Sequence, residues 1–258
     1  MTSHAIVSTV PMSEEDCHGN KESLVETIRP YVRDQTPVML RGAALHARAI
    51  ECWKTWNYFE SAVDGDTPCH VEVGGNYAHS QICNIRFGDY LAYLWAFEER
   101  YGRSGKHVLP SEDLVYLAQN DVFEGLHQDF DIADFCTDHS LGEGRLYSTM
   151  IWIGPFGCVS PLHFDPMDNA LMQFVGKKRV MMYPPGTNVY AGVDGNQFNT
   201  SPLNPEHPFD LSKYPLAADL PLCIECTMYP GDILYIPRKW WHHIRTMETS
   251  VSVNSWWR

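Results

Sequence analysis

The second half of the chain is a series of short β-like segments, and this pattern constrains the fold more than any other feature. The segments are rich in β-branched and aromatic residues, and Gly, Pro, Asn and Asp separate them. Many short strands without intervening helices are typical of a β-barrel or β-sandwich. We predict strands at 114–118, 146–153, 159–164, 170–175, 179–183, 223–228, 232–236, 242–246 and 250–257.

The first part of the chain has a different texture. Apolar residues recur at helical spacing in three segments, and the spacing predicts helices at 22–32, 53–63 and 89–101. Two short apolar runs between them, 37–42 and 70–73, predict strands. We therefore expect a mainly β fold that N-terminal helices buttress.

A chain of 258 residues is long enough to bury one sizeable core. We expect a flexible tail over residues 1–20, a mixed helical subdomain over 21–112, and a β core over 113–258. Gly176-Lys-Lys178 is a candidate for a tight hairpin between two strands. The proline-rich stretch 184–222 is too long for a plain loop, so it predicts an ordered insertion near the functional site.

One motif in the β region carries the chemistry of a metal site. His163 and Asp165 are two residues apart, so on an extended strand both side chains point the same way. His242 follows a predicted turn, strand and turn, which can return a distant strand to the first one. Two imidazoles and one carboxylate are the ligand set of non-haem Fe(II) oxygenases, with open positions for a bidentate co-substrate and O2. We predict a metal site at His163, Asp165 and His242.

Two other pairs match the same short pattern, at His70-Val-Glu72 and His127-Gln-Asp129. A single pair of this kind is weak evidence for a metal. The segment around His127 lacks alternation and indicates a loop or helix end, and no later histidine on a well-formed strand answers His70. His243 points away from His242 on a strand, so we expect it to be a surface or packing residue.

An oxygenase of this type needs an organic acid that supplies electrons, such as 2-oxoglutarate. Its distal carboxylate needs a buried cation or hydroxyl donors. Lys178 fits the cation role, although a solvated hairpin lysine is the alternative. Ser160 and Asn169 lie near the predicted ligand strand, and Tyr116 on another strand offers a phenol.

Charge and cysteine content limit the partners. The net charge of −13 disfavours nucleic acid, and it suits a basic peptide or simple solubility. Residues 1–20 show no export signal and no apolar run is long enough for a membrane span, so we expect an intracellular protein with reduced thiols. Cys223 and Cys226 have CxxC spacing without a second pair, which favours two small buried residues over a metal site.

Together these motifs resemble the Jumonji-C (JmjC) family of Fe(II)- and 2-oxoglutarate-dependent oxygenases. The likeness rests on Ser160-Pro-Leu-His-Phe-Asp-Pro166, on Gly176-Lys-Lys178, and on the run from Pro230 to Trp241-His242. Val71-Glu-Val-Gly74 and Tyr116-Leu-Ala-Gln119 are similar to the Jumonji domain-containing protein 5 branch, which includes arginyl hydroxylases and lysine demethylase 8.

The resemblance implies a double-stranded β-helix, which is a jelly-roll, cupin-like barrel. It implies that Fe(II) is bound by His163, Asp165 and His242, and 2-oxoglutarate by Tyr116, Ser160, Asn169 and Lys178. It also implies a substrate pocket with Glu72 and Trp152, where a carboxylate pairs with a guanidinium and an indole packs on its stem.

The function that this resemblance implies is hydroxylation of a protein side chain, with an arginine in a basic peptide as the expected target. One alternative is demethylation of a histone methyl-lysine. An alternative from another class is a non-catalytic, cupin-like metal-binding protein. We expect a monomer in the nucleus or the cytoplasm, with no nucleic-acid or membrane partner.

Overall fold

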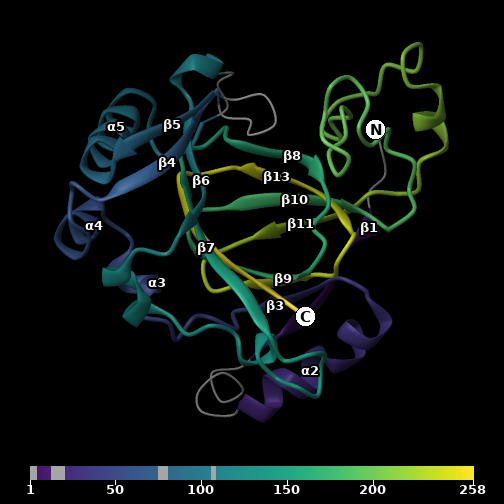
Figure 1. Cartoon of the computed structure of the whole chain (residues 1–258), viewed down its shortest axis with the longest axis horizontal. Helices are drawn as coiled ribbons and strands as arrows, with labels where there is room; N and C mark the ends of the chain where they lie inside the picture. Colours follow the sequence, from purple (N-terminus) through teal and green to yellow (C-terminus); the bar gives the residue numbers. More distant parts are fainter. Residues whose placement is uncertain (1–4, 13–20, 75–80, 106–108) are drawn as a thin grey trace.

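The computed structural model of the chain describes residues 5–12, 21–74, 81–105 and 109–258, and Figure 1 shows two β-sheets around a common interior. The larger sheet has the strand order β2-β3-β12-β9-β14-β7-β6-β4-β5 and the smaller one β1-β11-β10-β13-β8. The strands of the larger sheet are β2 (Ser8–Pro11), β3 (Val38–Arg41), β4 (Pro68–Val73), β5 (Gln81–Arg86), β6 (Val115–Asp121), β7 (Leu146–Gly154), β9 (Asp168–Val175), β12 (Ile233–Ile236) and β14 (Ser250–Trp257). Those of the smaller sheet are β1 (Ala5–Ile6), β8 (Val159–His163), β10 (Lys178–Tyr183), β11 (Ile224–Met228) and β13 (Trp241–Thr246).

The strands from β7 to β14 form the jelly-roll. Strands β7, β14, β9 and β12 are neighbours in the larger sheet, and β8, β13, β10 and β11 are neighbours in the smaller one. All pairs between these neighbours are antiparallel. The chain therefore crosses repeatedly from one sheet to the other, and the predicted mainly β, cupin-like double-stranded β-helix is confirmed.

Strands β9 and β14 are buried along their whole length because both of their faces are covered. On one face, Met172, Phe174 and Val253 join the main hydrophobic core. On the other face, Leu171 and Asn254 point into the interior between the sheets, where both line one cavity. These two strands therefore connect the core to the site.

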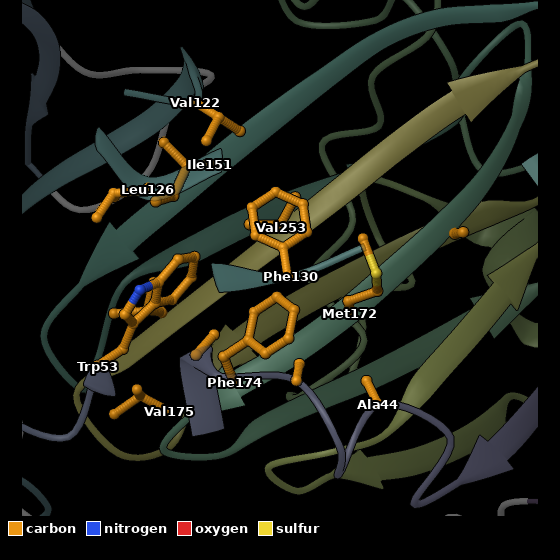
Figure 2. Packing of buried hydrophobic residues seen from close by; sticks show 14 of the residues in the cluster. Ala44, Trp53, Val122, Leu126, Phe130, Ile151, Met172, Phe174, Val175 and Val253 are labelled. Carbon is orange, nitrogen blue, oxygen red and sulfur yellow. The ribbon is translucent and has the colours of Figure 1, made fainter. Parts of the chain in front are cut away.

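The helices cover the outer face of the larger sheet. They are α2 (Lys21–Asp34), α3 (Ala49–Cys52), α4 (Trp56–Ala62) and α5 (Phe87–Tyr101). Figure 2 shows Trp53 from the α3–α4 connection against Phe174 of β9, with ring centroids 5.1 Å apart, and Phe130 stands 5.6 Å from Phe174. The Trp53–Phe174 pair is edge-to-face, an arrangement that adds about 0.5–1.5 kcal/mol to the burial of apolar area.

The helices predicted at 22–32 and 89–101 are confirmed as α2 and α5. The helix predicted at 53–63 is split, because Trp53 ends α3 and a new helix begins at Trp56. No described helix is both long and apolar enough to cross a bilayer.

The expectation of a flexible tail over residues 1–20 is wrong for residues 5–11. Strand β1 pairs in parallel with β11, and β2 pairs in parallel with β3. Each strand covers a sheet edge whose backbone N–H and C=O groups otherwise lack strand partners. Residues 1–4 and 13–20, and Cys17 with them, lie outside the described residues.

The predicted hairpin at Gly176-Lys-Lys178 is also wrong, because β9 and β10 belong to different sheets. The connection instead carries the chain across the barrel. Gly176 has φ +70°, and a Cβ there would lie 2.2 Å from the carbonyl oxygen of Thr249. Only glycine fits this crossing without strain.

The division of the chain at residue 113 stays a prediction. Strand β4 lies before it and pairs with both β5 and β6, so residues on both sides of the boundary share one sheet. The predicted insertion at 184–222 lies beside the barrel: Ser201 N donates to Leu162 O at 2.8 Å, and Phe164 N donates to Asn199 O at 3.0 Å.

Candidate metal centre and active site

The predicted metal ligands meet at the end of two paired strands. In the antiparallel pair of β8 and β13, His163 lies directly opposite His242. The two imidazole rings are 4.2 Å apart between centroids. Strand pairing therefore explains how residues so far apart in sequence converge at one point.

Asp165 reaches the same point by a different route from the one that the two-residue spacing suggested. Strand β8 ends at His163, so Asp165 lies beyond it and strand alternation does not orient its side chain. Its Oδ2 instead accepts hydrogen bonds from Trp256 Nε1 at 2.9 Å and from Asn169 Nδ2 at 3.3 Å. Lys239 N donates to the backbone oxygen of Asp165 at 2.8 Å, which fixes the turn.

The hydrogen bonds of the two imidazoles determine which nitrogen faces the centre. Nδ1 of His163 is 2.7 Å from Pro161 O, and Nδ1 of His242 is 3.0 Å from Trp240 O. A carbonyl oxygen only accepts, so both Nδ1 atoms carry the proton and donate it. Nε2 is then the nitrogen that faces Asp165 in both residues, which is the arrangement of metal-binding histidines.

Electrostatics favours the form of His242 that binds metals. Burial, followed by the nearby His163, lowers the pKa of His242 below its ordinary value, and Asp165 only partly opposes this. The imidazole is therefore neutral at pH 7, and no proton has to leave before a metal binds.

The three side chains fit one divalent ion. Two atoms that each lie about 2.1 Å from a common ion are at most about 4.2 Å apart. Nε2 of His163 is 4.0 Å from Oδ1 of Asp165, and Nε2 of His242 is 3.7 Å from Oδ2 of Asp165. Among the described residues these three form a group whose potential ligand atoms all lie within 4.8 Å of one another. Two nitrogens and one carboxylate oxygen on one side suit non-haem Fe(II).

A buried lysine, for which the described residues provide no acidic partner, lies in the same cavity. Lys178 begins β10 and is 2% exposed. Its Nζ donates to Ser252 Oγ at 2.5 Å and to Tyr116 Oη at 3.3 Å. No carboxylate in the described part of the chain raises the pKa of Lys178, and burial of the amine lowers this pKa to about 7. A cation in this environment favours an anionic ligand.

Most of the predicted site residues line one cavity between the sheets. Tyr116, Trp152, Ser160, Asn169 and Lys178 surround it together with the three candidate metal ligands. Glu72 is not part of this lining. It is half-buried on β4, directly opposite Tyr116 of β6, so it lies on the adjoining strand.

Asn254, which belongs to no motif singled out in the sequence, connects two parts of the site. Trp152 Nε1 donates to Asn254 Oδ1 at 2.7 Å, and Asn254 Nδ2 donates to Asn169 Oδ1 at 3.2 Å. Asn169 in turn donates to Asp165, so a chain of amides links Trp152 to a candidate metal ligand. A polar residue at every second position of a fully buried strand, as at Ser252 and Asn254, is the signal that predicts this role.

The rival His-x-acid pairs have other structural roles. His70 Nδ1 is in a short contact with Asn84 Oδ1 on the exposed side of β4. Asp129 is buried and accepts hydrogen bonds from Trp53 Nε1 at 2.9 Å and from Tyr58 Oη at 2.8 Å. His127 lies in the 3-10 helix Glu124–Asp129, in agreement with the prediction of a loop or helix end.

His243 is a packing residue and not a surface residue. It is 2% exposed, and its Nε2 lies 3.3 Å from Oε2 of Glu206 in the 184–222 insertion. Arg245 Nε also donates to Glu206 at 2.6 Å. Glu206 thus joins the insertion to the strand that carries His242.

A jelly-roll barrel with two imidazoles, one carboxylate and a buried lysine in its interior defines a cupin-type metal protein. The model of the family described as "Cupin-like domain" matches residues 24–258. The chain belongs to this cupin-like family, among its JmjC-domain members, and the resemblance noted in the sequence is thereby confirmed.

Three relatives illustrate the match. Lysine-specific demethylase JMJ30 of Arabidopsis thaliana is 33% identical over 91% of this chain and 53% of its own length. Jumonji C domain-containing protein 5 of Drosophila melanogaster is 31% identical over 86% of this chain and 54% of its own. Lysine-specific demethylase 8 of Danio rerio is 40% identical over 88% of this chain and 54% of its own length. The chain therefore spans about half the length of these relatives.

Proposed function

We propose that the protein is an Fe(II)- and 2-oxoglutarate-dependent dioxygenase that hydroxylates a protein side chain. The observation that carries this proposal is the position of Lys178. A buried cation without a described acidic partner shares a cavity with a candidate N,N,O metal centre. A dicarboxylate that chelates the metal at one end and meets a cation at the other satisfies both features.

In this proposal the residues of the chain hold and orient the reactants. His163, Asp165 and His242 hold Fe(II), which when bound supplies the redox chemistry that couples decarboxylation of 2-oxoglutarate to oxidation of a substrate C–H bond. Lys178 and Tyr116 hold the distal carboxylate of 2-oxoglutarate.

Further polar residues orient these groups. Asn169 fixes the carboxylate of Asp165 through its hydrogen bond. Ser160, which is 4% exposed, supplies a hydroxyl on the cavity wall. The indoles of Trp152 and Trp256 limit the access of water.

We propose an arginine in a basic peptide as the target. Glu72 lies on β4 directly opposite Tyr116, which lines the cavity, and a carboxylate is the group that pairs with a guanidinium. Trp152 has the flat surface that packs against the stem of such a side chain. The net charge of −13 favours a basic partner at long range.

The test is mass spectrometry of basic peptides after incubation with Fe(II), ascorbate and 2-oxoglutarate. The proposal predicts that arginine gains the mass of one oxygen atom and that succinate forms in equal amount. Glu72→Gln should weaken the use of the peptide more than the use of 2-oxoglutarate.

Demethylation of a methyl-lysine is the second candidate. The names of JMJ30 and of lysine-specific demethylase 8 favour it. Release of formaldehyde from a methylated histone peptide, without oxygen retained on arginine, would support it. If neither turnover nor iron-dependent binding of 2-oxoglutarate occurs, the protein is instead a non-catalytic cupin-like metal-binding protein.

We further propose that the protein acts as a monomer inside the cell, in the nucleus or the cytoplasm. The seven cysteines of the described residues are free thiols, which suits a reducing compartment. Light scattering coupled to size-exclusion chromatography tests the first part, and fluorescence microscopy of the tagged protein tests the second.

A further inference from the structure

A second concavity lies beside the candidate active site, against strands β4, β6 and β7. Its volume is about 980 Å³, within the range of ligand sites but more open than the metal cavity. Its floor includes His70 of β4, Asn120 of β6 and Met150 of β7. The ends of helix α4 and of β6 continue into its walls at 62–67 and 121–125. We call it the acidic groove.

The charges that line the acidic groove all have one sign at neutral pH. Asp64, Asp121 and Glu124 are exposed in its walls, and its lining contains no lysine or arginine. Several exposed carboxylates elsewhere in the described residues pair with an arginine or lysine, as Asp66 does with Arg86. Within the described residues no ion pair is formed by the three groove carboxylates. They therefore remain available to cations from outside.

Strand geometry connects the acidic groove to the substrate side of the metal cavity. On β7, Met150 in the groove and Trp152 in the cavity are two residues apart, so both point to the same face. On β4, His70 in the groove and Glu72 are likewise two apart. Two residues of strand span about 7 Å, which is also the reach of two residues of an extended peptide.

Part of the groove lining belongs to the hydrophobic core. Figure 2 shows Val122 beside Ile151 and Leu126 in the hydrophobic core, and Val122 also lines the groove. The apolar side chains in the lining and the acidic walls together suit a lysine or arginine side chain, whose stem packs while its charged end stays at the rim.

We propose that the acidic groove binds the basic residues that flank the target residue of a peptide substrate. This inference rests on the proposed function, since it needs a peptide whose target side chain enters the metal cavity. The groove then determines specificity: it selects a lysine or arginine located two to four residues from the target, roughly the distance between cavity and groove.

The test measures the binding of two labelled peptides by fluorescence anisotropy. One peptide carries lysines on both sides of an alanine at the target position, and the other has glutamines instead. The lysine peptide should bind at least about tenfold more tightly at low salt, and the difference should shrink at high salt.

The triple variant Asp64→Asn, Asp121→Asn, Glu124→Gln should lose about tenfold in affinity for the lysine peptide. Its matched control, Glu99→Gln, Glu112→Gln, Asp219→Asn, removes the same charge from exposed sites outside the groove and should bind as the wild type does. Thermal unfolding checks the fold of both proteins, and the single variants Asp121→Asn and Glu124→Gln keep the test valid if the triple variant does not fold.

Equal loss in the groove variant and in the control variant would overturn the inference, as would equal binding of the two peptides or tighter binding of an RNA oligonucleotide. The outcome separates this inference from the proposed function. Lysine-dependent binding without any turnover would support the role of the acidic groove and contradict the proposed enzymatic function. Arginine hydroxylation with the same KM for lysine-flanked and glutamine-flanked peptides would support the proposed enzymatic function and contradict the role of the acidic groove.

Discussion

Replacement of Lys178 by methionine should make the protein more stable and at the same time unable to bind 2-oxoglutarate. The pKa of Lys178 falls from 10.5 to about 7 because the amine is buried. A lowered pKa means that the folded protein disfavours the charged form. Holding that charge in the ligand-free barrel at neutral pH therefore destabilises the fold by roughly 4 kcal/mol.

Methionine has a similar length and no charge. Its introduction leaves the hydroxyls of Tyr116 and Ser252 without the amine, at a cost of about 1–3 kcal/mol in total. The net gain is then about 1–3 kcal/mol, which raises the melting temperature by several degrees for a chain of this size. The gain should be largest at and below pH 7, and it should vanish as the pH approaches 10.5, where the lysine is neutral even in the unfolded chain.

The loss of co-substrate binding should be large. A buried carboxylate that loses its charge partner costs about 3–5 kcal/mol, or roughly 150- to 5000-fold in affinity. Thermal unfolding without oxygen, with Mn(II) and with or without 2-oxoglutarate, reports both quantities in one assay. Wild type should show a melting temperature that rises with 2-oxoglutarate, and Lys178→Met should not.

Lys177→Met is the matched control, because Lys177 is a half-exposed neighbour that pairs with Glu248 at 2.7 Å. It should keep the response to 2-oxoglutarate and gain no stability. A Lys178→Met protein that is less stable than wild type across this pH range, or that still responds to 2-oxoglutarate, would refute the reasoning.

Three further predictions concern the surroundings of the site. His242→Ala should abolish Mn(II) binding in calorimetry, whereas His243→Ala should keep it and lose stability only; equal loss of binding in both would mean that the wrong histidine was chosen. Burial raises the pKa of Glu206, but hydrogen bonds and charges from its partners bring it down to about 2, so its contribution to stability is present above pH 4.5 and is lost between pH 4.5 and 2. Glu206→Gln should therefore flatten the acid limb of a stability–pH curve, and an unchanged limb would contradict this. Gly176→Ala should destabilise the protein by about 1–3 kcal/mol in urea unfolding, since a Cβ there meets the carbonyl oxygen of Thr249; an unaltered midpoint would argue against the close approach.

Local pattern was enough to predict the strands of the barrel and the three residues that converge at the candidate metal centre. Strand β14 is an example, because its sequence alternates valine with polar residues over its first five positions. The pairing partner of each strand was harder to predict from the sequence. The Gly176 turn resembles a hairpin locally, and only the global crossing between sheets determines that β9 and β10 do not pair.

The elements that the sequence analysis missed are short, or they gain their order from a neighbour. Strands β1 and β2 have two and four residues, and they are ordered by the exposed edges of two sheets. Strand β5 (Gln81–Arg86) is mostly exposed and exists because β4 offers it a partner. Such pairings depend on long-range contacts, so periodicity within the segment does not predict them.

Alternation within single strands also explains how the fold tolerates the site. On β14, Val251 and Val253 face the core under the helices, while Ser252 and Asn254 face the metal cavity. The buried charge of Lys178 lowers the stability of the ligand-free protein. The outward residues of the same strands offset this loss by packing against the helical layer. The N-terminal helices therefore support the candidate site from the opposite face of the sheet, because they stabilise the strands that hold a buried cation for which the described residues provide no carboxylate partner.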